Sequence, residues 1–169
     1  FEALIDGDQR LQLATVKAQA MLAYLLVEEA ERPGASYPRG SLMTLLWPDT
    51  TPESAQNNLR QTLYRLRQTL PAVEAKSGQR EQLLLSDRQS VHLNPAVPYW
   101  LDVAEFERRL READSGSEER RVANLVEATG YYRGHFLADV SVPDSEHFEN
   151  WATQFREELR RKALEAFHQ

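Results

Sequence analysis

One segment of the chain, residues 52–70, constrains the fold more than any other. Four leucines recur in it at helical spacing, within an arc of about 60° when plotted at about 100° per residue. They are Leu59, Leu63, Leu66 and Leu70. Thr51 is suited to cap such a helix, Pro52 fits its first turn, and Pro71 stops it. The segment therefore predicts an amphipathic helix about 27 Å long with one buried side.

The opposite side of this predicted helix carries amide, guanidinium and phenol groups. Its members are Asn57, Gln61, Tyr64, Arg65 and Gln68, with Asn58 and Arg60 on the flanks. Asn and Gln can pair bidentately with adenine, and Arg with guanine, in a DNA major groove that admits a helix. From Ser54 to Val73 the chain has no acidic residue, so phosphate would meet no like charge. An ordinary solvated polar face is the alternative, and composition alone leaves both open.

The segments around this helix predict a small α+β module. The expected elements are a hairpin within residues 1–13 turning at Asp6-Gly7-Asp8, helices over about 16–30 (capped by Thr15) and 39–47, and strands 82–86 and 90–94 joined by a tight turn at 87–89. This order of elements, with three helices between two strands and a closing hairpin, is that of a winged helix-turn-helix. We therefore predict an α+β fold of this class for the first half.

Three basic residues outside the main helix are placed where they could contact a nucleic acid. Arg88 occupies the tip of the closing hairpin, within reach of phosphate or a minor groove. Lys17 and Arg39 begin two of the helices, and helix N-termini attract phosphate. A solvated side chain is the alternative for each.

Two prolines within residues 95–98 mark the expected boundary between a domain of residues 1–97 and an all-α segment of residues 98–169. Residues 1–98 carry ten Lys and Arg against eleven Asp and Glu, a net charge of −1. Residues 99–169 carry ten against fifteen, a net charge of −5. Helices are expected over about 103–113, 118–132 and 145–168. Because this half is acidic, we expect it to supply packing and partner contacts and not DNA contacts.

The last predicted helix has more apolar residues than one neighbouring helix pair needs to cover. They are Phe148, Trp151, Phe155, Leu159, Leu164 and Phe167. The aromatic residues in this half are expected to form core and not a ligand cage, because their spacing is helical. Large apolar patches seldom remain in water, so we expect copies of this fragment to associate through the helix.

The sequence excludes several kinds of chemistry. Cysteine is absent, which rules out disulfides and thiolate sites. The longest apolar run, residues 21–27, is too short to span a membrane. No histidine pair has metal-ligand spacing, and no glycine-rich nucleotide motif or nucleophile motif occurs. We expect no enzyme activity, cofactor or metal, and a cytoplasmic location. The first residue is Phe, so a longer parent protein is expected.

Three motifs, in the right order, resemble a known family of bacterial activators. They are Leu45-Leu46-Trp47-Pro48-Asp49 with residues 58–67 (NLRQTLYRLR), then residues 99–107 (YWLDVAEFE), and then residues 131–137 (YYRGHFL) with 148–151 (FENW). The first resembles the OmpR/PhoB-type winged helix of Streptomyces antibiotic regulatory proteins. The others resemble the bacterial transcriptional activation domain that follows it there, a bundle of tetratricopeptide-like helices.

This resemblance implies a bacterial transcriptional activator with a phosphorelay-type effector domain, bound to double-stranded promoter DNA. It implies that helix 52–70 is the major-groove reader and that the loop before it contacts RNA polymerase. The DNA-reading residues would be Asn57, Asn58, Arg60, Gln61, Tyr64 and Arg65, beside Arg88 of the hairpin. The loop residues would be Pro48, Asp49, Thr50 and Thr51.

The chain has few basic residues, whereas high non-specific affinity for DNA requires many. The helix has only three arginines, and the whole chain has a net charge of −6. A second hypothesis therefore stays open, in which the chain is a protein-interaction module that has lost DNA contact.

Overall fold

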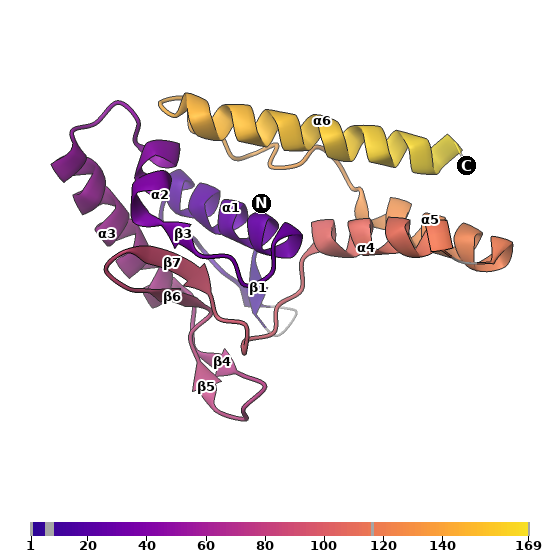
Figure 1. The fold of residues 1–169 in the computed structure, drawn as a ribbon, viewed down its shortest axis with the longest axis horizontal. Coiled ribbons are helices and arrows are strands. Elements are labelled where there is room, and N and C mark those ends of the chain that lie inside the picture. Colours follow the sequence, from indigo (N-terminus) through magenta and orange to yellow (C-terminus); the bar gives the residue numbers. More distant parts are fainter. Residues whose placement is uncertain (1, 6–8, 116, 169) are drawn as a thin grey trace. The chain divides into compact units, whose positions relative to one another are not determined.

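The computed structural model describes residues 2–5, 9–115 and 117–168, which fall into two compact units (Figure 1). The first comprises Phe1–Pro98 with Asp139–Asn150, and the second Tyr99–Ala138 with Trp151–Gln169. The division after Pro98 lies beside the expected boundary. The units are not continuous in sequence, however, because residues 139–150 group with the first.

The first unit holds all the strands of the described residues. Its elements are β1 (Leu4–Ile5), β2 (Gln9–Arg10), α1 (Val16–Glu31), β3 (Tyr37–Pro38), α2 (Arg39–Leu46), α3 (Pro52–Thr69), β4 (Val73–Glu74), β5 (Arg80–Glu81), β6 (Leu84–Ser86) and β7 (Ser90–Leu93). The later elements are α4 (Asp102–Ser115), α5 (Glu118–Tyr131) and α6 (Glu146–His168). The first turn of α6 belongs to the first unit and the rest to the second.

Helix α1 begins where its capping residue places it. The Thr15 hydroxyl accepts a hydrogen bond from Ala18 N at 3.1 Å, which satisfies one of the unpaired amides of the first turn. The helix ends at Glu31, and Gly34 follows with φ of 79°, a left-handed conformation that glycine adopts without steric cost. The predicted helix and its cap are confirmed.

Helix α3 matches the predicted amphipathic helix. Thr51 Oγ1 accepts a hydrogen bond from Ser54 N at 3.3 Å, and Pro52 occupies the first turn. The seam residues Leu59, Leu63, Leu66 and Leu70 are 0%, 3%, 1% and 6% exposed. Burying one leucine side chain stabilises a fold by about 1.5–3 kcal/mol. The seam therefore sets the rotation of α3 and turns its polar side to solvent.

The predicted closing hairpin is present as β6 and β7, and β3 joins it in an antiparallel sheet of order β3-β7-β6. Tyr37 pairs with Val91 and Pro38 with Ser90, so the chain that enters α2 is held against the hairpin. Strand β3 and the β4–β5 hairpin were not predicted. Strands of two residues are too short to show a period of two in the sequence.

The N-terminal hairpin is shorter than predicted. Strands β1 and β2 pair antiparallel, but β2 ends at Arg10 and not at Leu13. Leu11 N still donates to Ala3 O at 2.8 Å, and Leu11 and Leu13 are half-buried between exposed neighbours, as expected. Residues 12 and 13, which the prediction included in this strand, pair with no strand of the described residues. The expected turn at 6–8 lies outside the described residues.

The second unit is helical, as predicted, with small shifts at the helix ends. Helices α4 and α5 form a packed pair, and a small core joins Ala113, Leu125 and Ala166, with Leu110 against it. None of the described helices is both long and apolar enough to cross a membrane.

The apolar side of α6 is covered over much of its length. Phe148, Phe155 and Leu159 are 0%, 7% and 3% exposed, and Trp151 is half-buried. Phe136 contributes to this cover in the second unit, with its ring 4.9 Å from the Phe155 ring. Only the C-terminal part of the side stays open, where Leu164 is 46% and Phe167 60% exposed. The exposed apolar surface is therefore smaller than the sequence pattern predicted.

Candidate nucleic-acid interface

The polar side of α3 faces solvent along its length. The exposed residues are Asn57, Arg60, Gln61, Tyr64, Arg65 and Gln68, and Asn58 is half-buried. Tyr64 is 66% exposed, so its ring projects from the helix without packing into the core. The structure thus brings the six candidate residues of this helix onto one side, with the leucine seam opposite.

Two of these candidates contact each other. Arg60 Nη2 donates a hydrogen bond to Asn57 Oδ1 at 2.7 Å, one turn apart on the helix. Arg65 makes no side-chain hydrogen bond or ion pair within the described residues. Its charge is therefore available to an anionic ligand.

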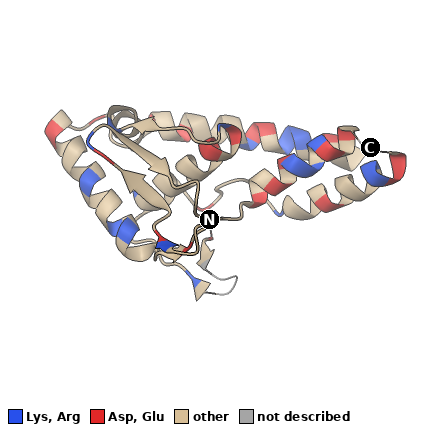
Figure 2. Ribbon diagram, turned by 60° about the horizontal axis from the view of Figure 1, so that its bottom comes forward, with Lys and Arg blue, Asp and Glu red and all other residues tan. Residues whose placement is uncertain are grey.

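Charge along α3 is uniform in sign beyond its first turn. Figure 2 shows basic segments on this helix without acidic ones between them, whereas the helices of the second unit mix the two signs. Glu53 lies in the first turn, where a carboxylate interacts favourably with the positive end of the helix dipole. A polyanion would meet little repulsion on this surface.

The turn between β6 and β7 is closed by hydrogen bonds from backbone amides. Asp87 N donates to Ser90 O at 3.0 Å. The Asp87 carboxylate accepts hydrogen bonds from the amides of Gln89 at 2.7 Å and Ser90 at 2.8 Å. These two amides hold the pKa of Asp87 below its usual value. Arg88 lies exposed at this turn and makes no side-chain hydrogen bond or ion pair with any described residue.

The two basic residues at helix starts are already engaged with the protein. Lys17 Nζ lies 2.6 Å from Asp144 Oδ2 and 5.5 Å from the centre of the Trp47 ring. Arg39 Nη1 donates to Asp87 O at 3.3 Å. The expectation that these two cations face phosphate is therefore not favoured by their contacts.

The α2–α3 connection is short and exposed. Pro48 is half-buried, and Asp49, Thr50 and Thr51 are exposed. Thr50 Oγ1 donates to Trp47 O at 3.1 Å, which closes the turn after α2. Both threonines thus stabilise helix ends, and the Asp49 carboxylate remains open to a partner.

Sequence reasoning missed the role of residues 139–150. Ser145 is 0% exposed, and its hydroxyl donates to the carbonyl of Leu45 at the end of α2 while accepting from Phe148 N at 3.3 Å. Asp144 holds Lys17 of α1. The pKa of Asp144 is lowered chiefly by that hydrogen bond. In the sequence, the contact of this segment with α1 and α2 was signalled only by the serine at the expected start of the last helix.

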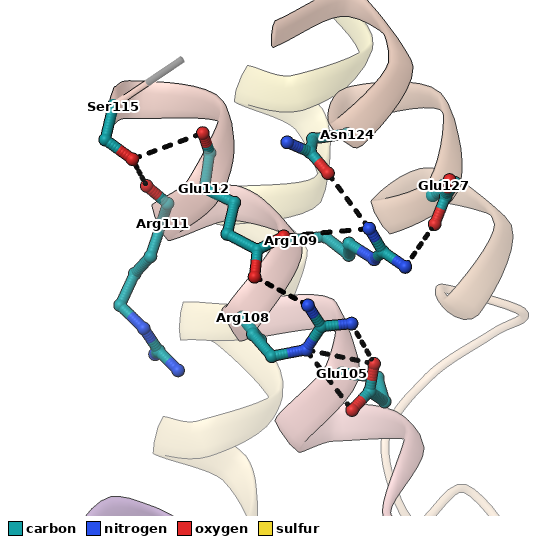
Figure 3. A network of polar contacts seen from close by, with 8 residues as sticks. All are labelled: Glu105, Arg108, Arg109, Arg111, Glu112, Ser115, Asn124 and Glu127. Atoms are coloured by element: carbon teal, nitrogen blue, oxygen red, sulfur yellow. Dashed lines mark hydrogen bonds and ion pairs between the residues drawn. The ribbon is translucent and has the colours of Figure 1, made fainter. Parts of the chain in front are cut away.

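Ionic contacts in the second unit hold helices together. Figure 3 shows Arg109 of α4 reaching α5, where Nη1 donates to Asn124 Oδ1 at 3.1 Å and Nη2 lies 2.6 Å from Glu127 Oε2. Lys162 of α6 lies 2.6 Å from Glu107 of α4. Arg109 and Lys162 are each paired with a carboxylate on another helix, which is typical of a structural network and not of an anion site.

No group of three or more His, Asp or Glu in the part of the chain that the structure describes is placed to hold a metal ion.

Comparison with known proteins bears on both units. Residues 101–169 match the family model of the bacterial transcriptional activator domain. A comparison with curated proteins gave no significant match. Among solved structures, the fold is similar to Mycobacterium tuberculosis EmbR in complex with a low-affinity phosphopeptide, with a TM-score of 0.70 and 23% identity over 98% of this chain. This chain spans 42% of the length of that protein. It thus shares the fold of EmbR and carries, in residues 101–169, a match to the bacterial transcriptional activator domain.

Proposed function

We propose that this chain is the promoter-binding part of a bacterial transcriptional activator, in which α3 reads the major groove of double-stranded DNA. The observation that carries the proposal is the exposed side of α3, which holds amide and guanidinium groups opposite a fully buried leucine seam. At about 27 Å the helix is long enough to lie along a groove about 12 Å wide.

The surrounding elements support a winged helix-turn-helix. Helices α2 and α3 are joined by a short exposed connection, and the β6–β7 hairpin follows α3. In this arrangement Asn57, Asn58, Arg60, Gln61, Tyr64 and Arg65 face base edges, and Arg88 faces phosphate or the minor groove. Arg60 and Arg65 would select guanine, and Gln61 would select adenine.

Partner contacts follow from the same proposal. The connection Pro48–Thr51 would contact RNA polymerase, and the helical second unit would bind further protein partners. Its match to the bacterial transcriptional activator domain supports this role. The exposed Leu164 and Phe167 give a surface for association between copies. A regulator with this function would act in the cytoplasm and would not be an enzyme.

Fluorescence anisotropy with promoter DNA, repeated at several salt concentrations, tests the proposal. A selection from a random DNA pool then gives the preferred sequence of the wild type and of Arg60→Ala, Gln61→Ala and Arg65→Ala. A bidentate base contact is worth about 1–3 kcal/mol of discrimination, so at least one variant should lose its preference at one position. Arg160→Ala, an exposed α6 residue of equal charge, is the control and should change nothing. No saturable binding at low salt, or an unchanged preference in all three variants, would refute the proposal.

A protein-interaction module is the second candidate function. Val122 and Val126 lie one turn apart on α5 and are 52% and 66% exposed, which favours an apolar partner. The first 98 residues are also close to neutral. The same titration separates the two functions, because this module would bind no DNA site at low salt.

A further inference from the structure

Two arginines outside the proposed DNA-reading set hold the β6–β7 hairpin. Arg39 donates twice, from its backbone N to Gln89 O at 2.9 Å and from Nη1 to Asp87 O at 3.3 Å. Arg67 Nη2 donates to the Ser86 hydroxyl at 2.8 Å. Both guanidinium groups are thus directed at the hairpin.

These contacts come from different elements and meet the hairpin at different points. Arg39 is the first residue of α2, directly after β3, which pairs with β7. Arg67 lies near the end of α3 and reaches the last residue of β6. The hairpin is therefore connected to both helices of the proposed helix-turn-helix.

The two carbonyls that Arg39 binds stand on either side of Arg88. Between them the backbone is closed by the Asp87 carboxylate, which accepts from the amides of Gln89 and Ser90. The peptide groups on both sides of Arg88 thus make hydrogen bonds. The Arg88 side chain itself makes no hydrogen bond or ion pair with the described residues. Because this backbone is already held by hydrogen bonds, binding through Arg88 would not also have to order the turn.

We propose that Arg39 and Arg67 are positioning residues that fix the hairpin, and with it Arg88, relative to α3. They act on DNA through Arg88 and not through their own charges. The proposal rests on the DNA-binding function proposed above and names two further determinants of it.

A double-mutant cycle tests whether Arg39 acts through Arg88. We expect Arg88→Ala and Arg39→Ala each to weaken DNA binding by about three- to tenfold at low salt, as expected for the loss of one backbone contact. The double variant should bind like Arg88→Ala alone, since the residue being positioned is gone. Effects that multiply would show that Arg39 contacts DNA independently and would overturn the proposal.

Ser86→Ala gives a test of Arg67 that leaves all charges in place. It removes the hydroxyl that Arg67 binds, so it should weaken DNA binding as much as Arg67→Ala does. If Ser86→Ala binds like the wild type while Arg67→Ala is weakened, Arg67 acts by its own charge and the proposal fails for it.

Amide hydrogen exchange of the free protein, read by NMR, is independent of DNA. Arg39→Ala, Arg67→Ala and Ser86→Ala should each speed exchange at the amides of Asp87 and Ser90 by about fivefold or more. Arg80→Ala is the matched control, because it removes an arginine that binds the Ala72 carbonyl beside the β4–β5 hairpin. Unchanged exchange in the three variants overturns the proposal. If the wild type binds no DNA, the function proposed above fails, and the exchange result alone decides whether these residues fix the hairpin.

Discussion

Phe148 provides the sharpest test of how this chain is divided into folding units. The residue lies on the first turn of α6 and is 0% exposed, within residues 139–150 that group with the first unit. Truncating a fully buried phenylalanine to alanine typically costs about 3–5 kcal/mol, from lost burial and the cavity left behind. Because a whole domain is stable by only about 5–15 kcal/mol, Phe148→Ala should remove a large part of the stability of that unit.

Urea denaturation gives the change in the free energy of unfolding, and hydrogen exchange shows where it falls. We expect Phe148→Ala to speed exchange throughout α1 and α2, which are far from it in sequence. Phe167→Ala is a matched control on the same helix, since that ring is 60% exposed and its loss should cost below about 0.5 kcal/mol. A cost for Phe148→Ala below about 1 kcal/mol, or faster exchange confined to α6, would refute the assignment of residues 139–150 to the first unit.

Three further predictions concern single features of the structure. The buried Tyr37 hydroxyl has no hydrogen-bond partner among the described residues, so Tyr37→Phe should be neutral or stabilise by up to about 1 kcal/mol in thermal or urea unfolding; a clear loss would show a hidden partner. The pKa of Asp87 is lowered by hydrogen bonds from two amides, so its stabilisation of the turn is complete above the usual aspartate pKa of about 4 and is lost as pH falls through the lower folded value. NMR of the Gln89 and Ser90 amides against pH should show this transition, and Asp87→Asn should abolish it. Sedimentation over a wide concentration range should show association of the wild type that Leu164→Ser with Phe167→Ser removes; persistent association in that variant would place the contact elsewhere.

Local signals in the sequence were enough for the helices and the hairpin turn. The caps Thr15 and Thr51, the leucine seam of α3 and the turn at 87–89 each lie within one short window. Periodicity and capping depend on neighbours in the chain, so the sequence alone predicts which side of α3 is buried and which carries the candidate DNA-reading residues. Their role as DNA contacts stays a prediction.

The tertiary structure decided what depends on contacts between distant residues. Strand β3 exists because Tyr37 and Pro38 meet β7, more than fifty residues later. The same holds for Arg39 and Arg67, whose side-chain contacts with the hairpin no local sequence pattern predicts. Ser145 seats the first turn of α6 on a carbonyl of α2, one hundred residues away. No window of the sequence contains both partners of these contacts. Only the path of the folded chain brings them together. For this reason Lys17 and Arg39, which the sequence suggested as phosphate contacts, bind groups of the protein itself.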